Sequence, residues 1–296
     1  MPELPDIEDY LAALRPRVVG QPLEHVRIAG FALLKSYDPP ITAVEGAVVT
    51  GLRRIGKRIV FEWGDEDLFL VLHLMIAGRL KWLDPGAKIP RKYGQAAFDF
   101  PDGTLLLTEA GTKKRASLYL VRGEEDLAAH DRGGIEPLDA TAAEFAAALT
   151  RENRTLKRAL TDQRLFSGIG NAFSDEILHA AGLSPVKRTR QLDDDEVARL
   201  HEATVRVLTD WVARLRDQTG EGFPANVTAF RDEFAVHGRY EQPCPVCATP
   251  VQRIRYADNE TNYCARCQTD GKVLADRSLS RLLKEDWPRT IEELEG

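Results

Sequence analysis

The residues at the amino end of the chain have the types needed for covalent chemistry. Methionine before a small residue is normally removed, which would leave Pro2 with a free secondary amine. An α-amino group titrates near pH ~7.7–8.0, so a useful fraction is unprotonated in the cell, whereas a lysine near ~10.4 is mostly protonated. Such an amine can form a Schiff base, and Glu3 can supply a proton. Pro5, Glu3 and Asp6 also suit an ordinary helix start, which is the favoured interpretation of these residues alone.

The four cysteines of the chain fall into two tight pairs near its C-terminal end. Cys244 and Cys247 are followed, after sixteen residues, by Cys264 and Cys267. This spacing is typical of one structural Zn²⁺ ion, whose four thiolate ligands leave no position open for water. Two disulfides or a redox pair are the alternatives, but two complete pairs in a chain that we expect to be intracellular favour zinc. A polar turn between the pairs predicts a β-hairpin ribbon.

A glycine-rich segment precedes a predicted helix in the second half of the chain. Gly168, Gly170 and Asn171 stand where backbone N–H groups and the helix dipole can hold a phosphate. Lys157 lies one helix upstream, so a helix–turn–helix arrangement would bring both to one phosphate backbone. An ordinary helix start is the alternative, and the motif gains weight only in combination with others.

The composition of the 296-residue chain is that of a soluble globular protein, with 43% hydrophobic and 29% charged residues. No apolar run approaches ~20 residues and no signal peptide is present, so we expect a cytoplasmic, nucleoid-associated protein with no membrane partner. The net charge of −6 argues weakly against a nucleic-acid partner. Basic residues nevertheless cluster, which permits one face to bind a polyanion, although an even spread around the fold is the alternative. The basic clusters lie at 53–58, 113–115, 151–164 and 187–190.

The hydrophobic periodicity changes along the chain. Ile7, Tyr10 and Leu14 recur at helical spacing, and short apolar runs separated by turns then fill residues 23–122. Many short strands of this kind predict a β-sandwich or barrel. A Gly- and Pro-containing linker follows near 131–138, and helical periodicity dominates 141–235, with the longest helix at 193–217.

In combination, these motifs resemble the formamidopyrimidine-DNA glycosylase / endonuclease VIII family of base-excision repair enzymes. The resemblance runs from residue 1 to about residue 268, with the motifs in the family's order. Each motif is modest alone, but their ordered combination is specific. The residues that carry it are 1–5, 53–57, 73–78, 136–138, 155–157, 168–171, 237–239 and the four cysteines.

The resemblance implies a bifunctional DNA glycosylase/AP lyase that acts on damaged double-stranded DNA as a monomer. Pro2 would be the nucleophile and Glu3 the general acid, and Lys57 would hold the phosphate beside the lesion. The damaged base would be flipped out of the duplex, and β- and δ-elimination would then nick the strand. The further DNA contacts implied are His73, Lys157 and Asn171 at phosphates, Met75 or Ile76 in the void left by the base, and Asn259 of the ribbon.

The implied fold is α+β and multidomain. A β-sandwich catalytic domain with a leading helix would span 1–133, and a helical helix–two-turn–helix domain would span 134–235. A four-cysteine zinc-finger hairpin would span 236–284, before a C-terminal tail at 285–296. Within the extension beyond residue 268, a further helix is indicated by Leu279, Leu282 and Leu283.

Several positions depart from the family pattern, and they concern the lesion rather than the chemistry. Asp6 stands where the family often has Glu, and residues 109–115 lack the Arg-Phe wedge of members specific for oxidised purines. The 220–238 segment is short for the loop that covers 8-oxoguanine in that subfamily. We therefore expect broad or atypical lesion specificity.

Two other functions remain open from the sequence. One is a relative that binds abasic or damaged DNA without efficient base excision, and the presence of Pro2, Glu3 and Lys57 argues against it. The other is a zinc-ribbon regulator of transcription, which leaves the amino end unexplained.

Overall fold

The chain forms two compact units in a computed structural model that describes residues 1–256, 259–276 and 288–295. The first unit comprises Met1–Arg132 and Trp211–Thr228, and the second comprises Gly133–Asp210 and Ala229–Gly296. The long helix α6 (Asp194–Thr219) contributes residues to both units. Across these described residues, no helix has both the length and the apolar character needed to cross a membrane.

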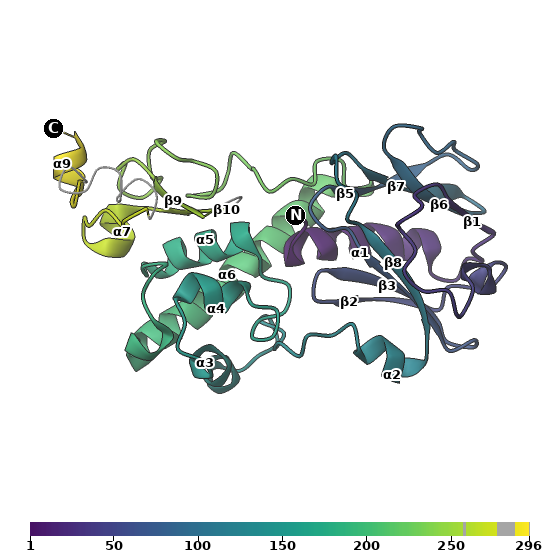
Figure 1. The fold of residues 1–296 in the computed structure, drawn as a ribbon, viewed down its shortest axis with the longest axis horizontal. Coiled ribbons are helices and arrows are strands. Elements are labelled where there is room, and N and C mark those ends of the chain that lie inside the picture. Colours follow the sequence, from purple (N-terminus) through teal and green to yellow (C-terminus); the bar gives the residue numbers. More distant parts are fainter. Residues whose placement is uncertain (257–258, 277–287, 296) are drawn as a thin grey trace. The chain divides into compact units, whose positions relative to one another are not determined.

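The first unit contains two four-stranded antiparallel sheets and a leading helix, α1 (Leu4–Val18) (Figure 1). One sheet has the order β1-β6-β7-β5 and the other β2-β3-β4-β8. The strands are β1 (His25–Ile28), β2 (Gly51–Ile55), β3 (Arg58–Trp63), β4 (Leu68–His73), β5 (Gly78–Leu83), β6 (Gly94–Phe100), β7 (Gly103–Glu109) and β8 (Ser117–Arg122). A 3₁₀ turn, η1 (Ile41–Val44), follows β1.

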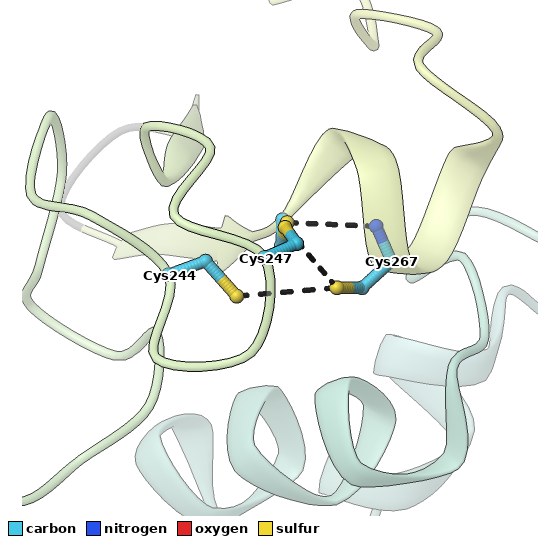
Figure 2. Close-up of side chains that lie close together, drawn as sticks. Cys244, Cys247 and Cys267 are labelled. Carbon is cyan, nitrogen blue, oxygen red and sulfur yellow. Dashed lines mark hydrogen bonds between the residues drawn. The ribbon is translucent and has the colours of Figure 1, made fainter.

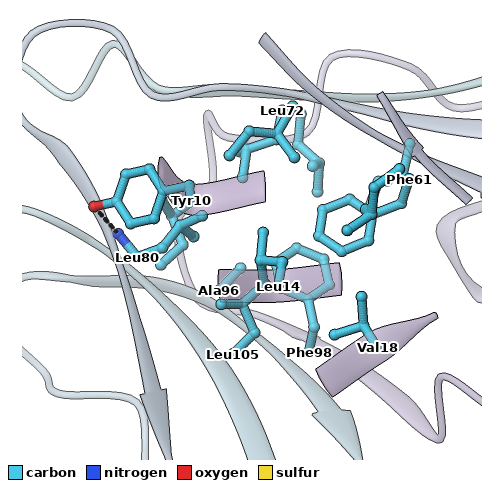
Figure 3. Packing of buried hydrophobic residues seen from close by; sticks show 14 of the residues in the cluster. Tyr10, Leu14, Val18, Phe61, Leu72, Leu80, Ala96, Phe98 and Leu105 are labelled. Atoms are coloured by element: carbon cyan, nitrogen blue, oxygen red, sulfur yellow. Dashed lines mark hydrogen bonds between the residues drawn. The ribbon is translucent and has the colours of Figure 1, made fainter. Parts of the chain in front are cut away.

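Both sheets and α1 bury their apolar side chains in one core. Along β3, Phe61 and Trp63 point into this core, whereas Val60 packs on the opposite face near α2 (Gly123–Ala128). This alternation is the period of two expected of a strand. Figure 3 shows the side chains of α1, including Tyr10, meeting those of both sheets. The backbone N–H of Leu80 donates to the Tyr10 hydroxyl at 3.2 Å, which joins α1 to β5.

The second unit is helical and carries a small hairpin. Its hairpin strands pair antiparallel, with Tyr263 opposite Gln252. The end of the tail packs on this hairpin, where Ile291 is buried with Ile254 and Tyr263. The elements are α3 (Ala142–Thr150), α4 (Leu156–Thr161), α5 (Asn171–Ala181), η2 (Thr189–Gln191), β9 (Gln252–Tyr256), β10 (Asn259–Tyr263), α7 (Ala265–Thr269) and α9 (Ile291–Glu295), besides the first part of α6.

This architecture confirms the predicted α+β class, with N-terminal sheets behind a leading helix, a helical part and a cysteine-bearing hairpin. The longest predicted helix, 193–217, is α6, which begins one residue later and ends two residues later. The helix predicted from Leu279, Leu282 and Leu283 lies outside the described residues.

Candidate active site and nucleic-acid interface

The amino end of the chain is buried at the start of α1. Pro2 is buried, and Glu3, the N-cap residue, is only 3% exposed. The Glu3 backbone N–H donates to Asp6 Oδ2 at 2.8 Å, which fixes the first turn of the helix. The helix-start interpretation of this segment is therefore correct as local structure. It does not compete with the chemical interpretation, because Pro2 and Glu3 stand next to each other directly before the first turn of α1.

Four charged side chains act on the amino group. Burial lowers the pKa of the Met1 amino group below its ordinary value, and the cations Arg79 and Lys57 add to this effect. The carboxylates of Glu3 and Asp6 act in the opposite direction. A lowered pKa leaves more of the Met1 amino group unprotonated at neutral pH.

Lys57 is placed by the tight turn between β2 and β3. Ile55 pairs with Arg58, so Gly56 and Lys57 form a two-residue hairpin turn. Gly56 has a φ of 59°, a conformation that favours glycine, and Arg54 Nη1 donates to the Gly56 carbonyl at 2.8 Å. The turn holds Lys57, 6% exposed, where its charge acts on the amino group.

His73 ends β4 among several cations of the first unit. Its cross-strand partner is Arg58 on β3. Burial, together with the charges of Arg58, Lys57 and Arg132, lowers the pKa of His73 to about 4. The imidazole is therefore neutral at physiological pH. Cations gathered around a neutral donor suit an anionic ligand such as a phosphate.

Met75 and Ile76 lie in the turn between β4 and β5. Met75 has a φ of 54° and is partly buried, whereas the Ile76 side chain is 55% exposed. A Cβ atom at Gly78 would collide with the Leu74 carbonyl, so this turn requires glycine there. Of the two predicted void-filling residues, Ile76 is the one that the turn presents to solvent.

Arg79 was not assigned from the sequence, although it is a key residue of this region. Its Nε atom donates to the Val227 carbonyl at 2.5 Å and its Nη1 atom to the Gly78 carbonyl at 2.7 Å. Val227 belongs to the core of the first unit, and Phe223 packs on Tyr10 with ring centroids 5.8 Å apart. The segment after α6 is thus fastened to the first unit. A basic residue after a turn was the only signal for Arg79 in the sequence.

The 109–115 region, which lacks the Arg-Phe wedge, is closed by a buried carboxylate. Glu109 is 2% exposed and accepts hydrogen bonds from the backbone N–H groups of Arg115 (2.8 Å) and Ala116 (3.3 Å). These contacts hold the end of the loop against the last residue of β7.

In the second unit, the structure brings Lys157 and the glycine-rich segment together. Lys157 Nζ donates to the Asn171 carbonyl and to Asp175 Oδ1, both at 2.6 Å. Gly170 is the N-cap of α5, and Gly168 has a φ of 79°. The two helices α4 and α5 therefore form the turn that the sequence predicted, with Lys157 at the N-terminal end of α5.

A buried polar network extends from this turn. Asp175 is fully buried, and its Oδ2 atom lies 2.7 Å from His237 Nδ1. The neighbouring Glu176 accepts three backbone hydrogen bonds, from Ala235, Val236 and His237, at 2.7–2.9 Å. Sequence reasoning missed both carboxylates, because their partners lie about sixty residues away.

The hairpin contacts the same helix. Asn171 Nδ2 donates to the Glu260 carbonyl at 3.0 Å, and Asn262 Oδ1 accepts from the Gly238 N–H at 2.9 Å. Asn259, the predicted DNA contact of the ribbon, is exposed at the start of β10. The structure thus joins Asn171 to the ribbon and leaves the Asn259 side chain at the surface.

The four cysteines converge, and their sulfur atoms lie within 4.8 Å of one another. Figure 2 shows Cys244, Cys247 and Cys267 pointing toward one another. Three of the Sγ–Sγ distances are 3.9, 3.4 and 3.5 Å. Four thiolates around tetrahedral zinc, with Zn–S near 2.3 Å, would stand about 3.8 Å apart, whereas a disulfide requires about 2.05 Å. The cluster therefore fits one structural zinc ion, as predicted, and not two disulfides.

Three family profiles match the chain. The formamidopyrimidine-DNA glycosylase N-terminal domain matches residues 1–113 and the formamidopyrimidine-DNA glycosylase H2TH domain matches residues 134–221. The zinc finger found in FPG and IleRS matches residues 241–269. The three matches follow the order of the amine site, the α4–α5 turn and the cysteine hairpin.

Two known formamidopyrimidine-DNA glycosylases are similar to the chain over most of its length. The chain is 35% identical over 292 residues to the formamidopyrimidine-DNA glycosylase of Symbiobacterium thermophilum, covering 94% of this chain and 93% of that protein. It is 29% identical over 279 residues to the enzyme of that name from Listeria monocytogenes serotype 4b, covering 90% of this chain and all of that protein.

A solved structure of a formamidopyrimidine-DNA glycosylase is also similar to the chain. The Lactococcus lactis enzyme in complex with DNA containing an oxidised pyrimidine matches with a TM-score of 0.78 and 26% identity, over 90% of this chain and 100% of that one. With matching profiles over its N-terminal and helical parts, and a 35% identical relative aligned over nearly its full length, the chain belongs to the formamidopyrimidine-DNA glycosylase family of base-excision repair enzymes.

Proposed function

We propose that this chain is a bifunctional DNA glycosylase/AP lyase that uses the amine of Pro2 as its nucleophile. The observation that carries the proposal is the buried amino end, at which Glu3, Asp6, Lys57 and Arg79 act on the amino group. Membership of a glycosylase family supports the base-excision step. The lyase step is supported by the chemistry of the amine.

The reaction starts when the damaged nucleotide is flipped out of the duplex. The Pro2 nitrogen attacks C1′ of its sugar, and the N–C1′ bond forms as the glycosidic bond breaks and the base leaves with a proton. Glu3 protonates the ring oxygen, so that the sugar opens and an iminium forms. A covalent amine thereby divides one difficult cleavage into easier steps. Its position beside the amine favours Glu3 for this proton transfer.

Strand cleavage follows from the iminium. Loss of a proton from C2′ expels the 3′ phosphate, and a second elimination expels the 5′ phosphate. Water then adds to the remaining iminium and hydrolyses it, which releases the sugar fragment as an aldehyde and regenerates the amine. We assign Lys57 to the phosphate beside the lesion, because the hairpin turn places its charge near the amino group. His73, with its surrounding cations, is assigned to another phosphate of the same strand.

The second unit is assigned to further phosphates. Lys157 and Asn171 stand together at the start of α5, where a helix N-terminus favours an anion. Asn259 is assigned to the same role on the exposed side of the ribbon. Ile76, with Met75 behind it, is assigned to the void left by the flipped base, because its side chain is the exposed one.

A panel of labelled duplexes tests both the preferred lesion and the lyase activity. The panel contains 8-oxoguanine, formamidopyrimidine, oxidised pyrimidine and plain abasic sites, and strand products are analysed with and without hot alkali. Nicks that need no alkali and carry phosphate at both ends of the gap support the β,δ-lyase. Nicks that appear only after alkali would mean a glycosylase without lyase activity. Binding of abasic DNA with no cleavage at all would favour a non-catalytic relative.

A further inference from the structure

Three polar residues of α5 stand four residues apart, and each of them bonds a different part of the zinc hairpin and its lead-in segment. Asn171 reaches the Glu260 carbonyl of β10, and Asp175 pairs with His237 ahead of the first cysteine pair. The third, His179, places its Nε2 atom 3.3 Å from Cys244 Sγ. Residues at this spacing share one face of a helix. This face of α5 is therefore the surface on which the zinc-binding part of the chain is seated.

The contact between His179 and Cys244 is buried. His179 is 8% exposed and Cys244 is 2% exposed. Water is thus largely excluded, so a hydrogen bond to the sulfur is worth more here than at the surface. A zinc-bound thiolate carries negative charge and accepts hydrogen bonds, and such outer partners fix the ligand and strengthen metal binding.

We propose that His179 is a positioning residue of the zinc site, and that its Nε2–H group donates a hydrogen bond to the Cys244 thiolate. Zinc would then be held by the hairpin and, through Cys244, by α5. The same helix carries Asn171 at its first residue and binds Lys157 through Asp175. Retention of the metal and the order of the phosphate-binding turn thus depend on one helix.

A second contact supports this seating. Gln268 of α7 accepts a hydrogen bond from the Cys264 N–H at 2.8 Å and donates to the Leu183 carbonyl at 2.9 Å, just after α5. The Gln268 side chain therefore connects the backbone of the second cysteine pair to the backbone just after α5. The first pair is connected to α5 through the His179 side chain. Of these two connections, only the His179 contact reaches a sulfur ligand.

The test compares zinc release from the full-length protein and three His179 variants. His179→Phe keeps the ring and removes the donor, His179→Asn keeps a polar side chain too short to reach the sulfur, and His179→Gln keeps a donor at similar reach. His201→Phe is the matched control, because His201 is a histidine of α6 in the same unit whose Nε2 lies 3.1 Å from the Ala140 carbonyl. Zinc transfer to a chromogenic chelator gives the rate. In the cobalt-substituted proteins, the thiolate-to-cobalt charge-transfer band reports on the sulfur.

We expect His179→Phe and His179→Asn to release zinc about tenfold faster or more and to move the charge-transfer band to lower energy. His179→Gln and His201→Phe should remain close to the original protein in both readouts. Wild-type release and an unmoved band in the Phe and Asn variants would overturn the proposal. Equal losses in the Phe and Gln variants would also overturn it, because packing and not the hydrogen bond would then be responsible. No DNA is present, so the outcome is independent of the proposed reaction.

Discussion

The two units position their functional groups in different ways. In the first, short turns place single charged groups around one amine: the α1 start holds Glu3, and the β2–β3 turn holds Lys57. In the second, a buried network of hydrogen bonds connects α4, α5 and the segments before and within the zinc hairpin. A turn can be recognised from a few neighbouring residues, whereas a network joins residues that are far apart in the sequence.

This difference predicts where the molecule is sensitive. A substitution at the amine site should remove a chemical step and leave the fold intact. Loss of order in the whole network should loosen several of the proposed DNA contacts together, whereas a substitution at one proposed phosphate contact should weaken binding by about that contact alone.

The largest effect is expected from Glu3→Gln. The amide cannot supply the proton that opens the sugar ring, so excision and nicking should fall by about 10²–10⁴-fold, while the unfolding midpoint stays near that of the original protein. The measurement is single-turnover nicking of a lesion-containing duplex. Glu8→Gln is the control, since Glu8 lies on the same helix and pairs with Arg54 and Arg216. Activity of Glu3→Gln within a few-fold of the control would show that the carboxylate is not the acid.

Removal of zinc should act on the second unit. Chelation is expected to lower the affinity for abasic-site DNA on the order of 100-fold, because the ribbon and the α5 contacts lose their order together. Hydrogen exchange should show β9 and β10 losing protection while the core strands of the first unit keep theirs. Loss of protection in both units at the same zinc occupancy would contradict this division.

The half-buried His73 should make folding stability depend on pH. Its folded pKa of about 4 lies below the ordinary histidine value near ~6.5, so the unfolded chain binds the proton first as the pH falls. Stability is therefore lost between about pH 6.5 and pH 4, by about 2–3 kcal/mol. Urea unfolding at pH 7 and pH 4.5 measures this loss, which His73→Gln should reduce. An identical pH dependence in both proteins would refute the assignment.

A smaller effect is expected from Lys157→Ala, which removes the lysine that we assign to one phosphate. Affinity should fall similarly for every lesion, and the slope of log K against log salt should decrease by about one phosphate's worth. Arg206→Ala, which removes an exposed cation of α6, serves as the control. A loss confined to one lesion would place Lys157 in the base pocket.

Much of the first unit could be predicted from the sequence because its signals are local. The alternation of side chains along β3 depends on a few neighbouring residues, and so does the turn formed by Gly56 and Lys57. The four cysteines were equally clear, because their spacing alone restricts the metal. Asp175, Glu176 and His179 could not be assigned, because nothing near them in the chain shows that their partners are His237 and Cys244.

The role of Arg79 in the first unit could not be predicted from the sequence either. Its partner Val227 lies 148 residues away, and only the fold brings the two together. The difference in exposure between Met75 and Ile76 also required the structure, because both residues lie in a turn and the sequence does not show which side chain faces solvent.

Borohydride trapping tests the central claim most directly. The protein, with Met1 removed and verified by mass spectrometry, is mixed with abasic-site DNA and borohydride, and the reduced adduct is mapped by peptide sequencing. We expect one covalent adduct on the Pro2 nitrogen, abolished when Met1 is retained and strongly reduced in Pro2→Gly. An adduct of undiminished yield in these two proteins, or an adduct mapped to a lysine such as Lys57, would contradict it.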